Sequence, residues 1–399
     1  MGMVTRVRQG AKIISVILSC TIIVPALAAN PVSVDTKLRS VPDIQITLYA
    51  GDVGGARFLR FTSAGELIVS STGDGRVVIL SRDHDGDGAA DSRRILLDGL
   101  NGPHGIDLSG GMLYVAEEDA IGRIAINETT GNVEGVYTRI ITGLPQGGGH
   151  STRTVRVGPD GKLYVTVGSS CNVCLEDDPR RAAMLRYDID GSNGEIYARG
   201  LRNAVGFDWR PSDGALFATD NGRDLLGDDF PPDELNLIEQ SRHYGWPYAY
   251  GNNIPDPQLG AGAEEAIAKA APPAYEFRAH NAPLGIAFVR NPDAPAGLRG
   301  AALVALHGSW NRSTKDGYKV VSLHWQEDGG IAQRDFFWGF LDNDNVIGRP
   351  VDIAEGPDGA FYVSDDYAGV IYRLALVSNR CTWSLWPLRV PSLQCLIED

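Results

Sequence analysis

The chain has 399 residues, a length that allows one large all-β domain or two smaller domains. It contains 48 glycines, and many glycines between apolar stretches are typical of short strands joined by tight turns. The formal net charge of −14 argues against a basic surface of the kind that binds nucleic acid.

Residues 1–29 have the pattern of a secretory signal peptide. Basic residues precede an apolar core at 13–24, and Ala26-Leu27-Ala28 matches a small-residue cleavage site. The apolar core is too short for a comfortable transmembrane helix. We therefore expect an exported protein, periplasmic or secreted, without a stable membrane span.

Four cysteines remain beyond this segment. An even number in an exported protein favours disulfides, and the pairing that we expect is Cys171–Cys174 and Cys381–Cys395. The alternatives for Cys171 and Cys174 are a redox-active pair or half of a zinc site. No second CxxC motif or histidine pair has the spacing for zinc, and no thioredoxin-like βαβ pattern surrounds this pair. A structural clasp of the loop is the favoured interpretation.

From residue 56 onward one pattern recurs, in which an apolar strand, a turn with glycine and further strands follow one another. The first four repeats are spaced by roughly 45–50 residues with three or four strands each, which is typical of propeller blades. Helical repeats of this period would need amphipathic helices, and only residues 263–271 look helical. The first strands of the six repeats are expected at residues 56–61, 105–108, 154–157, 204–209, 284–289 and 351–354.

The pattern predicts an all-β fold, a six-bladed β-propeller over residues 30–377, with a long insertion between blades four and five. Residues 378–399 break the pattern and are expected to form a C-terminal appendage. Whether residues 31–54 close the ring with the last blade stays open at this point. The stretch 199–236 carries dense polar residues on both sides of a strand pair, which indicates either a site at strand ends or a loop that caps its own turns.

Residues 83–91 contain a candidate calcium loop. Carboxylates at Asp83, Asp85, Asp87 and Asp91 occupy positions 1, 3, 5 and 9 of an EF-hand-type pattern. Arg94 stands where that pattern has a bidentate glutamate. We favour a structural calcium over a solvated acidic turn, because carboxylates packed this closely repel one another without a cation.

His150 is the candidate general base. It follows three glycines, which let other groups approach closely, and it stands where the innermost strand of the third blade begins. An imidazole suits the abstraction of a proton from an alcohol whose hydride is leaving. His104 holds the equivalent place in the second blade and is the competing candidate.

Arginines recur at comparable strand ends, in Arg202-Asn203, at Arg312 and at Arg349. Several cations that converge on one channel imply an anionic ligand bound by charge-assisted hydrogen bonds. The alternative is that each arginine forms a surface ion pair.

Several motifs of the chain resemble those of the glucose/sorbosone dehydrogenase family, whose members are six-bladed propellers that use pyrroloquinoline quinone (PQQ) and calcium. The resemblance covers roughly residues 40–375 and does not include the C-terminal segment. The motifs that carry it are HGSWNR, RN-VGFDW, DNGRD-LGDD-PPDELN, YGWPY, GRPVDI and SDDYAGVIYR.

The resemblance implies roles for individual residues. His150 matches the general base, which takes the hydroxyl proton as hydride moves to the quinone. Arg202 and Asn203 match residues on the quinone side of PQQ, so Arg202 is expected to serve binding and catalysis. Arg349, and Arg312 with Asn311, are further residues implied to bind the cofactor. Gly222 and Arg223 are implied to hold its calcium through their backbone carbonyls.

Gly149 stands where glucose-oxidising members have an acidic residue before the base, which fits the sorbosone-like branch better. We therefore predict an oxidoreductase that acts on a sugar, a sugar aldehyde or a polyol and passes electrons to an external acceptor, either a quinone or a cytochrome-like protein. The alternatives are a calcium-dependent, lactonase-like hydrolase on a propeller of the same shape and a propeller that only binds a partner. Fold alone does not separate these functions.

Overall fold

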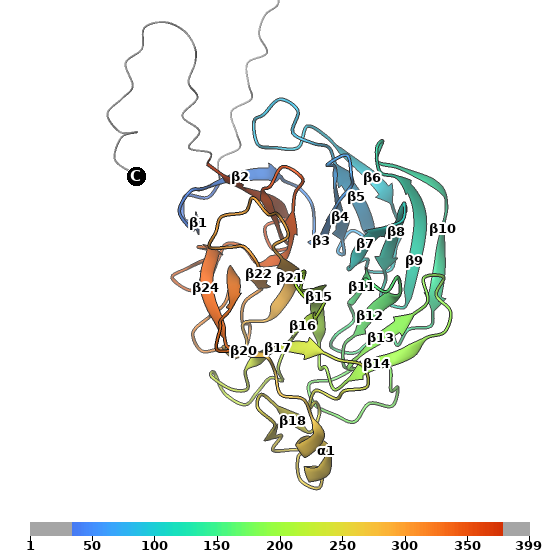
Figure 1. Ribbon diagram of the computed structural model, residues 1–399, viewed down its shortest axis with the longest axis vertical. Coiled ribbons are helices and arrows are strands. Elements are labelled where there is room, and N and C mark those ends of the chain that lie inside the picture. Colours follow the sequence, from blue (N-terminus) through green and yellow to red (C-terminus); the bar gives the residue numbers. More distant parts are fainter. Residues whose placement is uncertain (1–33, 378–399) are drawn as a thin grey trace, which may run out of the picture.

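Six antiparallel sheets form a ring in the computed structural model, which describes residues 34–377 (Figure 1). The innermost strand of each sheet contacts the innermost strands of both neighbouring sheets, so the ring is closed. The predicted all-β, six-bladed propeller is therefore confirmed. The predicted signal peptide, the C-terminal appendage and the Cys381–Cys395 disulfide lie outside the described residues.

The first three blades are built from consecutive strands. Blade one consists of β3 (Ala56–Phe61), β4 (Leu67–Ser71), β5 (Arg76–Leu80) and β6 (Arg93–Leu97). Blade two consists of β7 (Ile106–Ser109), β8 (Met112–Ala116), β9 (Ala120–Asn127) and β10 (Asn132–Thr142). Blade three consists of β11 (Arg153–Val157), β12 (Leu163–Val167), β13 (Ala183–Tyr187) and β14 (Glu195–Arg199).

The last three blades combine strands that are distant in the sequence. Blade four consists of β15 (Ala204–Trp209), β16 (Leu216–Asp220), β17 (Asp233–Ile238) and β20 (Tyr275–Phe277). Blade five consists of β21 (Pro283–Phe288), β22 (Ala302–Leu306), β23 (Lys319–Trp325), β24 (Ile331–Trp338) and β1 (Arg39–Ser40). Blade six consists of β27 (Pro350–Glu355), β28 (Phe361–Asp365), β29 (Val370–Leu376) and β2 (Ile44–Ala50).

The N-terminal strands close the ring. β2 pairs antiparallel with β29, the last strand of the described chain, and β1 pairs antiparallel with β24. Residues near the N-terminus therefore complete blades five and six, which answers the question that the sequence left open.

The long insertion leaves the sheet after β17 and ends before β20, so it lies within blade four, one strand earlier than expected. It carries the hairpin of β18 (Ala249–Tyr250) and β19 (Ile254–Pro255) and the helix α1 (Glu264–Lys269), and it projects from the rim of the ring (Figure 1). A second small hairpin, β25 (Leu341–Asp342) with β26 (Asn345–Val346), precedes blade six. None of the helices in the described residues is long and apolar enough to cross a membrane.

The second strand of a blade is covered on both faces by the neighbouring blades. Every residue of β4, β12, β16, β22 and β28 is buried, which is why these strands begin with apolar residues on both faces rather than with an alternating pattern.

Buried aspartates on the innermost strands of blades two, four and six connect these blades to the next ones. Asp107, Asp208 and Asp352 accept hydrogen bonds from the backbone N–H groups of Val157, Phe288 and Leu59, at 2.8, 2.9 and 3.0 Å. Arginines neutralise these carboxylates. Arg60 lies between Asp107 and Asp352, and Arg156 and Arg290 both bind Asp208 at 2.8 Å.

We expect Asp208→Asn to destabilise the fold by about 3–5 kcal/mol, because the change leaves Arg156 and Arg290 beside an uncharged partner in a site where the aspartate is 1% exposed. The midpoint of denaturant unfolding measures this effect. Asp213→Asn is the control, since Asp213 forms an ion pair with Arg210 and is 46% exposed, and it should change stability by less than about 1 kcal/mol. Equal effects of the two substitutions would contradict this assignment.

Candidate active site

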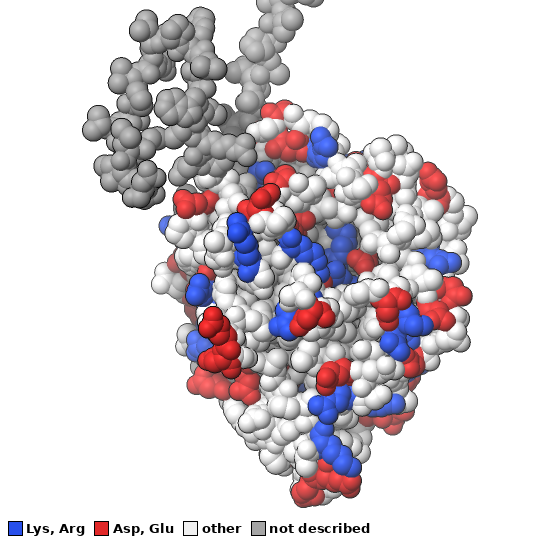
Figure 2. All heavy atoms as spheres, viewed as in Figure 1, with Lys and Arg blue, Asp and Glu red and all other residues white. Residues whose placement is uncertain are grey.

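A cavity of about 580 Å³ lies where loops of the blades converge. Its size is within the range of small-molecule sites, about 300–1,000 Å³. On the face shown in Figure 2, several basic side chains gather near the middle among acidic ones. Of the residues that the sequence singled out, those that line the cavity are Gly149, His150, Cys171, Arg202, Asn203, Gly222, Asn311 and Arg349.

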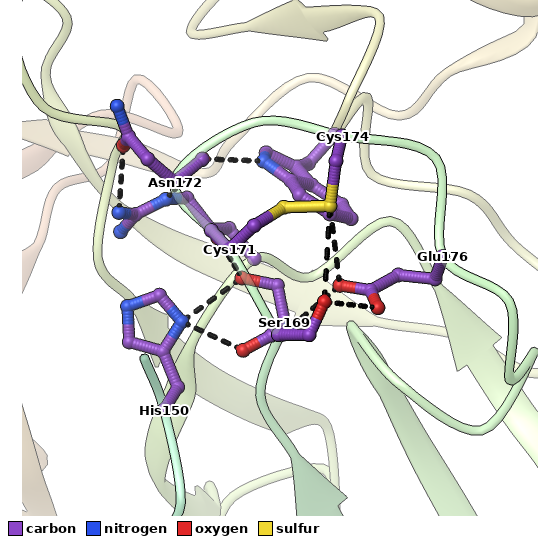
Figure 3. Close-up of a disulfide and its surroundings, with 9 residues drawn as sticks. His150, Ser169, Cys171, Asn172, Cys174 and Glu176 are labelled. Carbon is purple, nitrogen blue, oxygen red and sulfur yellow. Dashed lines mark hydrogen bonds between the residues drawn. A yellow bond between two sulfur atoms is a disulfide. The ribbon is translucent and has the colours of Figure 1, made fainter. Parts of the chain in front are cut away.

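His150 is held in one orientation by Ser169. Its Nδ1 lies 2.9 Å from the Ser169 hydroxyl oxygen and 3.1 Å from the Ser169 carbonyl oxygen (Figure 3). The Ser169 hydroxyl donates its own proton to the Cys171 carbonyl at 2.7 Å, so both oxygens near Nδ1 act as acceptors. Nδ1 therefore carries the proton, and Nε2, which has no partner among the described residues, keeps its lone pair.

The environment of His150 disfavours its protonated form. The pKa of His150 is lowered to about 4. Burial is the largest cause, and the positive charges of Arg202, Arg153 and Arg181 contribute to the same shift. At neutral pH the imidazole is uncharged and can accept a proton at Nε2.

Arg153 and Arg181 hold the glycine-rich loop that presents His150. Arg153 is fully buried and donates to the carbonyls of Pro145, His150 and Thr152. Arg181 donates to the carbonyls of Gln146 and Gly147 at 2.5 and 2.9 Å. Neither arginine forms an ion pair within the part of the chain that the structure describes, so both remain net positive charges behind the base.

Arg202 is buried against the wall of the cavity, and its N–H groups are directed at protein acceptors. Nε and Nη2 donate to the Asn172 carbonyl and side chain, each at 2.9 Å, and Nη2 also donates to Asp224 at 3.0 Å. Nη1 donates to the carbonyls of Asn221 and Gly222 at 3.1 and 2.7 Å. Arg202 therefore contributes positive charge to the cavity and ties the loops of blades three and four together.

Arg57, His307 and Asp366 form a linked group that the sequence did not reveal. Arg57 lines the cavity from blade one and donates to Asp366 at 2.5 Å, and His307 bonds the other Asp366 oxygen at 2.9 Å. Burial lowers the pKa of His307 to about 4, although the Asp366 carboxylate opposes this shift. His307 and Asp366 lie in the motifs HGSWNR and SDDYAGVIYR, which pointed to no role for either residue, and the signal for Arg57 was its position at the start of a strand.

Arg349 approaches the cavity from the start of blade six. Its Nε and Nη2 donate to the carbonyls of His307 and Gly308 at 3.1 and 2.8 Å, and its guanidinium lies over the Tyr318 ring. Its Nη1 has no partner among the described residues and remains a donor for a ligand.

Other predicted residues lie apart from this cavity. Arg312 binds Asp229 at 3.0 Å and the Asp228 carbonyl, and it is not among the lining residues. His104 is fully buried, with its Nε2 3.0 Å from Arg57 Nη2, so it does not reach the cavity that His150 lines. The side chain of Arg223 pairs with Asp256 at 2.6 Å in a separate, smaller cavity.

The Cys171–Cys174 disulfide is present, as predicted, and Cys171 lines the main cavity. The acidic loop lies elsewhere, in the connection between β5 and β6. Its Asp83, Asp85 and Asp91 carboxylates place oxygens within 4.8 Å of one another. Asp87 is not part of this group and instead accepts a hydrogen bond from the Ala89 N–H at 2.8 Å.

Comparisons with known proteins agree with this architecture. The family model described as TrAA12-like matches residues 39–376. An uncharacterized protein of Borreliella burgdorferi is 37% identical over 290 residues, which cover 69% of this chain and 76% of that protein. A pyrroloquinoline quinone-dependent sugar dehydrogenase of Hypocrea jecorina is 26% identical, over 63% of this chain and 69% of its own length.

Solved structures show the same fold. The calcium structure of a Trichoderma reesei enzyme of family AA12 has a TM-score of 0.76 at 22% identity and covers 87% of this chain and 99% of that one. The holo form of the pyranose dehydrogenase PQQ domain from Coprinopsis cinerea has a TM-score of 0.71 at 21% identity, covering 84% of this chain and 96% of that one.

These relatives confirm the resemblance to PQQ-dependent sugar dehydrogenases and the predicted class, an oxidoreductase. The sorbosone-like branch stays a prediction. Because the family match extends over almost the whole described propeller, this chain belongs to the TrAA12-like family.

Proposed function

We propose that the chain is a PQQ-dependent dehydrogenase that oxidises a sugar, a sugar aldehyde or a polyol. The observation that carries this proposal is the uncharged His150, whose Nε2 is free beside a cavity lined by Arg57, Arg202 and Arg349. A base next to a cationic cavity suits a reaction in which a hydroxyl proton is removed beside an anionic cofactor. The relatives that are named PQQ-dependent sugar dehydrogenases support it.

The donor set of the cavity fits PQQ, a planar molecule with three carboxylates. Arg349 has a free Nη1, and the side-chain amide of Asn203 forms no hydrogen bond with the described residues. Arg57 and Arg202 line the cavity as well, each with an aspartate as ion-pair partner, Asp366 and Asp224 respectively. We assign these four residues to cofactor binding, with Asn311 beside them.

When bound, PQQ would accept the hydride, and calcium would polarise its quinone. We assign the calcium to the backbone carbonyls of Gly222 and Arg223, carried over from the family. Gly222 lines the cavity, and its N–H is held by Asp233 at 2.7 Å, which fixes the orientation of this loop.

His150 would take the substrate hydroxyl proton at Nε2 while Ser169 holds the opposite side of the ring. Burial first, and then the charges of Arg202, Arg153 and Arg181, make the resulting imidazolium unfavourable, so the proton is released readily to solvent and the base is restored. Ser169 and the three arginines therefore keep His150 oriented and uncharged before each turnover.

The substrate would enter at the mouth of the cavity, where Trp310 is 70% exposed and Leu225 is 75% exposed. Gly149 offers no side chain beside the base, which favours a sorbosone-like substrate over glucose. Export through the leader at residues 1–29 belongs to the same proposal. An exported dehydrogenase of this kind delivers its electrons to an external quinone or cytochrome-like acceptor.

The first test is cofactor binding and turnover. We expect micromolar PQQ with Ca²⁺ to bind the purified protein, as followed by quinone absorbance, and to support sugar-dependent dye reduction. His150→Ala should keep PQQ binding and lose about 10²–10⁴-fold in kcat, because the general base is gone. His324→Ala, a change outside the cavity, is the control and should keep normal turnover. Absence of PQQ binding by the unaltered protein would refute the proposal.

The second test is the pH dependence of kcat/KM. Because the pKa of His150 is lowered to about 4, the protonated form accumulates only as the pH falls through about 4, and the rate should remain level down to about pH 5. Arg181→Gln removes one nearby charge and should move this acid limb to higher pH. Arg180→Gln is the matched control, since Arg180 pairs locally with Asp178. An acid limb near pH 6.5 in the unaltered protein would contradict the assignment.

The third test concerns the acidic loop, to which we assign a structural calcium. Calcium at about 100 times its Kd should stabilise the protein by about 2.7 kcal/mol through this site, measured as a rise in the thermal midpoint without PQQ. Asp83→Asn with Asp85→Asn should abolish most of the rise, because these carboxylates contribute two of the three clustered ligands. Asp98→Asn, an exposed change in the same blade, should leave it intact. An unchanged rise in the double variant would show that the calcium binds elsewhere.

A further inference from the structure

The loop closed by Cys171 and Cys174 forms part of the cavity wall, contacts Arg202 directly and reaches the base His150 through Ser169 (Figure 3). It follows β12 in blade three, whereas the groups that it contacts come from three different segments of the chain. Cys171 and Asn172 carry these contacts.

The first contact orients His150. The Cys171 carbonyl accepts the Ser169 hydroxyl proton at 2.7 Å, which leaves the Ser169 oxygen as an acceptor for His150 Nδ1 at 2.9 Å. If the Cys171 carbonyl moved away, the Ser169 hydroxyl could turn and donate to Nδ1 instead. The Ser169 carbonyl, 3.1 Å from Nδ1, would then be the remaining acceptor among the described residues for the proton on Nδ1, so the share of the other tautomer would rise and the lone pair on Nε2 would be directed at the cavity less often.

The second contact holds Arg202 and Asp224 through Asn172. The Asn172 carbonyl accepts from Arg202 Nε at 2.9 Å and from Trp246 Nε1 at 3.2 Å. The Asn172 side-chain oxygen accepts from Arg202 Nη2 at 2.9 Å and from the Asp224 N–H at 2.7 Å, and its Nδ2 donates back to the Asp224 carbonyl at 3.1 Å. One residue thus fixes the plane of a cavity arginine and the loop that carries Gly222.

Packing does little to hold this loop in place. None of the residues 170–180 is buried, and Leu175 is 63% exposed. Apart from the contacts above, the loop is fastened at Ser170, whose carbonyl accepts from the Gly149 N–H at 2.8 Å and whose N–H and hydroxyl donate to Glu176 at 2.6 and 2.7 Å. The disulfide adds a covalent constraint to these hydrogen bonds, directly beside Asn172.

We propose that Cys171, Asn172 and Cys174 are positioning residues of the active site, and that its catalytic geometry requires the Cys171–Cys174 disulfide to be closed. Reduction by a dithiol would break the S–S bond, and two electrons and two protons would yield two thiols as the reductant forms its own disulfide. The propeller would stay folded, because its blades are joined by buried contacts elsewhere, but substrate oxidation would fail. This inference rests on the proposed function only for its activity readout.

The experiment compares Cys171→Ser/Cys174→Ser with Cys381→Ser/Cys395→Ser in the full chain. The first variant should lose at least tenfold in kcat with PQQ and Ca²⁺, while its circular dichroism and cooperative thermal unfolding remain. The second variant is the control for the loss of two cysteines as such and should keep normal kcat, because the proposal assigns the effect to the loop at residues 171–174. In the unaltered protein, dithiothreitol should lower kcat to the level of the first variant, and reoxidation should restore it.

A readout without cofactor separates this inference from the proposed function. In the apoprotein, nitrogen NMR of the imidazoles, with His150 assigned by its loss in His150→Asn, should show Nδ1 protonated when the disulfide is closed. A mixture of tautomers should replace it in Cys171→Ser/Cys174→Ser. Failure of PQQ binding with this spectral change would refute the function alone. An unchanged His150 signal together with normal kcat would overturn the inference.

Asn172→Ala tests the second contact with the disulfide intact. It removes the acceptor for Arg202 Nη2 and the bond to the Asp224 N–H, so PQQ should bind at least fivefold more weakly while the His150 tautomer stays as in the unaltered protein. Asn172→Asp restores the oxygen and should recover part of the affinity. Unaltered binding by Asn172→Ala would show that Asn172 positions nothing that the cofactor uses.

Discussion

The ring depends on side chains that join innermost strands across blade boundaries. These strands belong to separate sheets, so no continuous backbone ladder runs from one blade to the next. Asp107, Asp208 and Asp352 replace that ladder by accepting backbone N–H groups of the following blade. A buried carboxylate is costly unless it is paired and hydrogen-bonded, and the arginines beside Asp107 and Asp208 meet that requirement, whereas burial still raises the pKa of Asp352 despite the opposing charge of Arg60.

A hydroxyl group and a glycine also allow the innermost strands of blades four and five to lie close together. The hydroxyl of Thr219 donates to the Leu284 carbonyl of the next blade at 2.7 Å and accepts from the Gly206 N–H at 3.1 Å, where β15 has a register shift. Gly206 itself allows this approach, since a Cβ there would lie 2.2 Å from the Leu284 carbonyl oxygen. The active-site loops enter or leave these strands, so the spacing of the blades also sets the distances across the cavity.

Much of the fold could be read from local pattern. The buried second strands begin with apolar residues and the turns between strands contain glycine, so the repeat that corresponds to a blade was visible along the sequence. The candidate site was visible only in part. His150, Arg202 and Arg349 stood out by type and position at strand ends, whereas Asn172 and Arg57 did not, because their partners Arg202 and Asp366 are distant in the sequence and no local pattern links them. Arg312 has the same local signature as Arg349, yet a bond to Asp229 holds it outside the lining of the cavity.

The sequence by itself determined the all-β class, the number of blades and the pairing of Cys171 with Cys174, because strand period, turn chemistry and a three-residue separation are local properties. The tertiary structure decided that β1 and β2 complete blades five and six, that the insertion belongs to blade four, and which arginines face the cavity. It also decided the state of His150. Burial and the charge of residues distant in sequence set the protonation of an imidazole, and both exist only once the ring has closed.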